Sequence, residues 1–115
     1  MRVLLVEDDP DQAAVRRMIL ETAGYDVLES SCPAEALSQI EFGRPHAVVM
    51  DLRLPREEDG LDLVKRIAPA APVIVLSGGC QLHSLPIFRF LKKPCRSEEL
   101  LRAIDEAVTQ NGPAS

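Results

Sequence analysis

Short runs of hydrophobic residues recur along the chain, separated by longer segments with helical spacing. The runs cover residues 3–6, 27–28, 47–50, 73–76 and 87–91. Four of the five are nearly continuous rather than alternating, which is typical of strands in a parallel sheet that is covered on both faces. The pattern therefore predicts five short, largely buried strands.

The first helix is expected directly after the first strand. Asp9 offers an N-cap, Pro10 suits the first helical position, and Gly24 ends the periodic pattern. The expected buried stripe of this helix consists of Ala14, Val15, Met18 and Ile19.

Further helices are expected between and after the other strands. Pro33 opens a second helix that stops near Gly43, and a third carries the spaced residues Leu61, Val64 and Ile67. The last begins around Ser97. Its hydrophobic face consists of Leu100, Leu101, Ile104, Ala107 and Val108. Residues 77–86 leave room for about two helical turns, so a short, irregular fourth helix or a loop is expected there.

A β-α unit repeated about five times predicts a doubly wound α/β domain with right-handed crossovers and helices on both faces. We expect one domain over residues 1–112 and a flexible tail at 113–115. The bare ending after Gly112 favours a stand-alone protein. The three cysteines, Cys32, Cys80 and Cys95, show no CxxC spacing and indicate reduced thiols.

Composition narrows the function classes. Hydrophobic residues make up 46% and charged residues 27%, as in an ordinary globular protein. The net charge of −5 argues against direct nucleic-acid binding, which needs a basic surface. The sequence has neither an apolar run of membrane-spanning length nor a signal peptide, so we expect a cytoplasmic protein with no membrane contact.

Polar residues follow four of the predicted strands, and the carboxyl ends of parallel strands share one edge of the sheet. Glu7 and Asp8 follow the first strand, Asp51 the third, Ser77 the fourth and Lys93 the fifth. Clustered carboxylates repel one another, and Mg²⁺ with its preference for oxygen ligands would neutralise them. A lysine nearby could hold a phosphoryl group during transfer to Asp51.

The motifs at these strand ends resemble the four signature stretches of bacterial response-regulator receiver domains. They read Val-Glu-Asp-Asp, Val-Val-Met-Asp-Leu-Arg-Leu-Pro, Val-Ile-Val-Leu-Ser-Gly and Phe-Leu-Lys-Lys-Pro, in this order and at compatible spacings across nearly the whole chain. The resemblance implies a flavodoxin-like (βα)5 fold with strand order 2-1-3-4-5. It also implies a two-component signalling function, in which a histidine kinase or a histidine phosphotransfer protein supplies the phosphoryl group.

The resemblance assigns roles to the acidic residues and to one backbone group. Asp51 matches the phosphoacceptor, and Glu7 and Asp8 match the acidic pair. Asp8 is expected to bind Mg²⁺ directly, together with Asp51, and Glu7 through water. Arg53 falls where the family lends a backbone carbonyl to the metal.

The resemblance also assigns the residues that would respond to phosphorylation. Ser77 matches the hydroxyl residue that hydrogen-bonds the phosphoryl oxygens, and Lys93 matches the lysine that pairs with them. The Lys93-Pro94 bond is expected to be cis. Phe90 falls at the aromatic switch position. The kinase or phosphotransfer partner is expected to dock near the first helix, and the switch would act on an unknown downstream protein.

The chain departs from the common receiver pattern in three places. Residues 55–60 look one residue longer than usual, with 57–59 expected as a solvated acidic loop. The fourth helix is shortened, and because that helix belongs to the usual dimer surface, we expect a monomer or a weak dimer. Cys95 stands where an aromatic residue often follows the Lys-Pro pair.

Two other functions compete with this interpretation. Phosphatases of the haloacid-dehalogenase type need a general acid two positions after the nucleophile. That position is Arg53, which holds its proton too firmly, so a turnover enzyme is not expected. The second is a phosphorylation-independent pseudo-receiver that acts as a protein-protein interaction module. The rebuilt loop and the shortened helix keep this alternative open.

Overall fold

Five parallel strands form one sheet in the order β2-β1-β3-β4-β5, which confirms the predicted flavodoxin-like topology. The structure is a computed structural model that describes residues 1–51, 57–77 and 87–110. The strands are β1 (Arg2–Val6), β2 (Asp26–Ser30), β3 (Ala47–Asp51), β4 (Val73–Ser77) and β5 (Arg89–Lys92).

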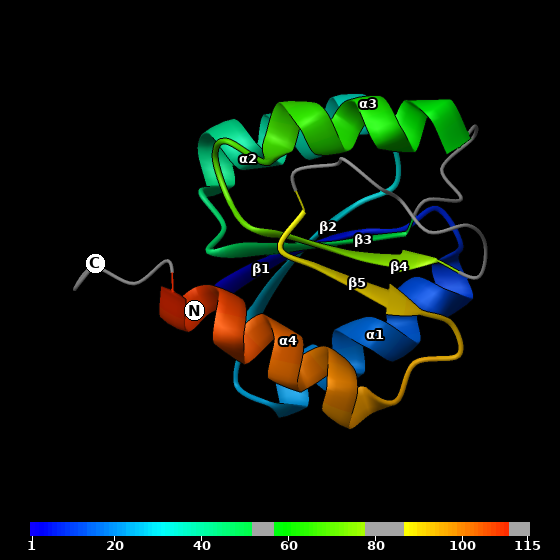
Figure 1. Ribbon diagram of the computed structural model, residues 1–115, viewed down its shortest axis with the longest axis vertical. Helices are drawn as coiled ribbons and strands as arrows, with labels where there is room; N and C mark the ends of the chain where they lie inside the picture. Colours follow the sequence, from blue (N-terminus) through cyan, green and yellow to red (C-terminus); the bar gives the residue numbers. More distant parts are fainter. Residues whose placement is uncertain (52–56, 78–86, 111–115) are drawn as a thin grey trace.

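Helices cover both faces of the sheet, as Figure 1 shows, with α2 and α3 on one face and α1 and α4 on the other. Their bounds are α1 (Pro10–Thr22), α2 (Pro33–Gly43), α3 (Glu57–Ile67) and α4 (Ser97–Gln110). The expected short helix at 77–86, apart from Ser77 itself, and the expected tail at 113–115 lie outside the described residues.

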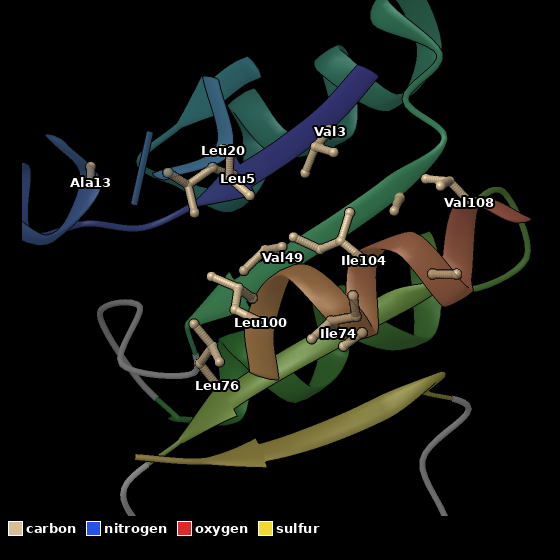
Figure 2. Close-up of a cluster of buried hydrophobic side chains, with 13 residues drawn as sticks. Val3, Leu5, Ala13, Leu20, Val49, Ile74, Leu76, Leu100, Ile104 and Val108 are labelled. Carbon is tan, nitrogen blue, oxygen red and sulfur yellow. The ribbon is translucent and has the colours of Figure 1, made fainter. Parts of the chain in front are cut away.

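The continuous hydrophobic runs feed two separate cores because successive strand residues point to opposite faces. In β1, Val3 and Leu5 face α1 and α4, whereas Leu4 and Val6 face α2 and α3. Figure 2 shows the first core, in which Ile104 of α4 packs toward the sheet. This two-sided burial explains why the interiors of β1, β3 and β4 contain no polar residues.

The predicted buried stripe of α1 was wrong. Val15 and Met18 are 59% and 69% exposed, whereas Ala13 and Leu20 are buried. The residue between them on the inner face is Arg16, whose side chain is only 12% exposed. The most hydrophobic face of α1 is therefore turned away from the sheet, because the inner face holds an arginine that has carboxylate partners.

The expected acidic loop at 57–59 was also wrong, since α3 already begins at Glu57. Acidic residues are favoured in the first turn of a helix, where the backbone amides and the macrodipole present positive charge. A run of acids is therefore as compatible with a helix start as with a loop. Within the described ranges, the helices are too short or too polar to cross a membrane.

Candidate functional site

The register of the parallel strands brings the polar residues together at one edge of the sheet. Val6 pairs with Met50, so Glu7 follows β1 beside Asp51, the last residue of β3. On the other side, the backbone amide of Lys93 donates to the carbonyl oxygen of Ser77 at 2.9 Å. The carboxyl ends of β1, β3, β4 and β5 therefore meet at one edge of the sheet.

Asp51 lies at the centre of this edge and is only 2% exposed. Its Oδ2 accepts a hydrogen bond from Lys93 Nζ at 2.5 Å. The Lys93 side chain is 20% exposed, so the ammonium group lies between the buried carboxylate and solvent. The peptide bond from Lys93 to Pro94 is cis, as expected.

Glu7 is the second buried carboxylate of the site, with 4% of its surface exposed. Its Oε2 accepts from the backbone amide of Asp9 at 3.2 Å, and its Oε1 accepts from Arg16. Burial, and then a hydrogen bond with Asp51 and the charge of that carboxylate, raise the pKa of Glu7 to about 7. The Asp9 amide and Arg16 act in the opposite direction.

Arg16 is a residue of the site that the sequence interpretation missed. Its Nη1 contacts Glu7 and lies 3.6 Å from Asp51 Oδ2. Helical side chains lean toward the N-terminus, so a residue of the second turn of α1 can reach the strand end. The available signal was a charged residue spaced three after Ala13 and four before Leu20, on the inner face.

The other predicted site residues differ in their exposure. Asp8 is exposed and, with Glu7, lines a cavity near the end of β2. Phe90 is half-buried and packs against the core beneath α2 and α3. Ser77 is half-buried at the end of β4, and Arg53 lies outside the described residues.

The donor chemistry of this edge fits Mg²⁺. The two buried side chains, Glu7 and Asp51, offer only oxygen donors, which Mg²⁺ prefers, and Mg²⁺ needs only one or two carboxylates. Burial, and then the hydrogen bond with Asp51 and the charge of that carboxylate, raise the pKa of Glu7, so a cation at this edge would favour its ionised form. Within the described parts of the chain, no three His, Cys, Asp or Glu side chains are gathered closely enough to hold a metal. The exposed Asp8, water and a backbone carbonyl would have to supply the remaining ligands.

Comparisons with known proteins agree with this geometry. The family model of the response regulator receiver domain matches residues 3–105. Transcriptional regulatory protein GlrR of Escherichia coli K12 is 32% identical over 98% of this chain and 27% of its own length. Transcriptional regulatory protein PdtaR of Mycobacterium tuberculosis is 33% identical over 95% of this chain and 57% of its own length.

A solved structure shows the same fold. The receiver domain protein (CheY-like) of Methanospirillum hungatei JF-1 has a TM-score of 0.87 at 24% identity, over 99% of this chain and 98% of its own. The chain belongs to the response-regulator receiver family, whose members serve two-component signal transduction. It spans about a quarter to just over half of the two curated relatives named above.

Proposed function

We propose that this chain is a phosphorylation switch that accepts a phosphoryl group on Asp51 from a histidine kinase or a histidine phosphotransfer protein. The observation that carries the proposal is the buried Asp51 carboxylate with Lys93 Nζ at 2.5 Å and Glu7 beside it. A buried carboxylate beside a second acid is costly unless cations compensate it, and an uncommon arrangement of this kind favours a functional site.

In the proposed transfer, a carboxylate oxygen of Asp51 attacks phosphorus. A P–O bond forms while the P–N bond of the phosphohistidine breaks, and its electron pair stays on the imidazole nitrogen. Mg²⁺ held by Asp8, Asp51, the Arg53 carbonyl and, through water, Glu7 would neutralise the charge of the phosphoryl oxygens. The Lys93 ammonium group then leaves the Asp51 carboxylate and pairs with a phosphoryl oxygen.

The proposed switch depends on the residues next to Asp51. The Lys93 amide is bonded to the Ser77 carbonyl at 2.9 Å, so movement of Lys93 is coupled to the end of β4. Phe90, three residues before Lys93 and half-buried, would repack when Ser77 approaches the phosphoryl group. The added charge biases a conformation that already exists, and the new surface acts on a downstream protein.

The decisive experiment exposes the purified chain to acetyl phosphate and Mg²⁺ and measures its intact mass. One added phosphoryl group is expected on the wild type and on Asp26→Asn, which alters an exposed aspartate at the start of β2. Asp51→Asn should remain unlabelled. No labelling of the wild type would favour the pseudo-receiver alternative, and labelling of Asp51→Asn would contradict the assigned acceptor.

A further inference from the structure

Arg16 places a permanent positive charge inside the acceptor site. Its Nη1 contacts Glu7 Oε1 and lies 3.6 Å from Asp51 Oδ2, and its side chain is 12% exposed. The two buried carboxylates therefore have a protein cation on the Glu7 side as well as Lys93 on the other.

The pairing compensates the burial of Arg16 in this structure. The inner face of α1 otherwise buries Ala13 and Leu20, and a charged side chain there is costly unless it is paired. The matched residue Arg17 behaves differently, because it pairs with Glu21 and Glu29 at the surface and is 41% exposed.

We infer that Arg16 is a built-in competitor of Mg²⁺, so that the metal binds at the acidic edge only when the guanidinium group releases Glu7. The inference rests on the proposed function, which takes Glu7 and Asp51 as residues of the magnesium site. A guanidinium group in contact with Glu7 repels an approaching divalent cation and occupies an oxygen that the hydrated metal would use.

The structure offers the released side chain a place to go. Arg16 lines a cavity between α1 and the segment that runs from Lys93 to the start of α4, and its other polar lining residues are Gln12, Lys93 and Ser97. A guanidinium group turned into this cavity would keep polar neighbours while it leaves Glu7. The exchange would set the Mg²⁺ concentration at which the site becomes competent for phosphoryl transfer.

The test is a calorimetric titration of the full chain with MgCl₂ alone. Arg16→Met keeps the aliphatic length and removes the charge, and it should bind Mg²⁺ on the order of tenfold more tightly than the wild type. Arg17→Met should match the wild type. Equal or weaker binding by Arg16→Met would overturn the inference, because the arginine would then assist the metal or be irrelevant to it.

A second variant protects the test against misfolding. Arg16→Gln keeps a polar side chain, and its melting temperature should rise more with added Mg²⁺ than that of the wild type. An equal or smaller rise would count against competition. Acetyl phosphate labelling of the wild type separates the two proposals. If Asp51 is labelled but the Arg16 variants do not bind Mg²⁺ more tightly than the wild type, the competitor role alone is rejected. If the Arg16 variants bind Mg²⁺ more tightly but the wild type is not labelled, the phosphoacceptor role of Asp51 alone is rejected.

Discussion

Lys93 Nζ lies 2.5 Å from Asp51 Oδ2, so an ammonium group is the direct counter-ion of a carboxylate whose side chain is only 3% exposed. The two residues are held on different strands or their extensions, 42 positions apart in the sequence. Their pairing therefore depends on the completed sheet, and the sheet depends in part on their pairing.

Replacing Lys93 should destabilise the fold in the absence of metal. Lys93→Met leaves Asp51 buried beside Glu7, with Arg16 at 3.6 Å as its remaining cation among the described contacts. Breaking a buried ion pair costs about 3–5 kcal/mol, and the partial exposure of Lys93 reduces the expected loss to about 2 kcal/mol. Urea unfolding at neutral pH with a chelator measures this change.

Two matched variants sharpen that experiment. Lys92→Met alters the exposed neighbour and should change the free energy of unfolding by less than about 0.5 kcal/mol. In an Asp51→Asn background the Lys93→Met change should cost clearly less, because no buried charge is left without its partner. Equal costs in both backgrounds would show that Lys93 stabilises the fold without using Asp51.

The strands and the site edge could be predicted because they follow from local and topological rules. Runs such as 47–50 are hydrophobic on both faces, which only a doubly covered strand requires. Once the strands are parallel, their carboxyl ends coincide, and Glu7, Asp51 and Lys93 must converge. The family resemblance then supplied roles that convergence alone does not define.

The orientation of α1 could not be predicted from hydrophobicity. Val15 and Met18 are more hydrophobic than Arg16, yet they are exposed and Arg16 is largely buried. The reason is a tertiary contact: Arg16 is stabilised by Glu7 and Asp51, which lie on two other elements. A periodicity argument sees only the residues of one helix and misses a partner elsewhere in the chain.

The exposed hydrophobic residues of α1 suggest where a phosphodonor protein docks. Val15 and Met18 are 59% and 69% exposed on α1, the helix that contributes Arg16 to the acceptor edge. Val15→Asp and Met18→Asp should each slow phosphoryl transfer from a purified histidine kinase by about tenfold or more, because a charge would be buried in the complex. Labelling by acetyl phosphate should stay unchanged, since that small donor needs no docking surface.

Phe42 provides the matched control for this docking prediction. It is 77% exposed on α2, which covers the opposite face of the sheet. Phe42→Asp introduces the same charge at a comparable hydrophobic position and should leave transfer from the kinase unaffected. If all three variants slow transfer equally, the effect reflects net charge and α1 is not the docking element.

Glu7 should make the stability of the metal-free protein depend on pH. Its pKa is raised from 4.5 to about 7 in the folded chain, so the folded state binds this proton more tightly than the unfolded state. The contribution of Glu7 to stability is therefore full below about pH 4.5 and is lost as the pH rises to about 7. Glu7→Gln, which cannot ionise, should remove this decline. Urea unfolding of both proteins with a chelator between those limits measures the difference, and parallel pH profiles would show that folding does not raise the pKa of Glu7.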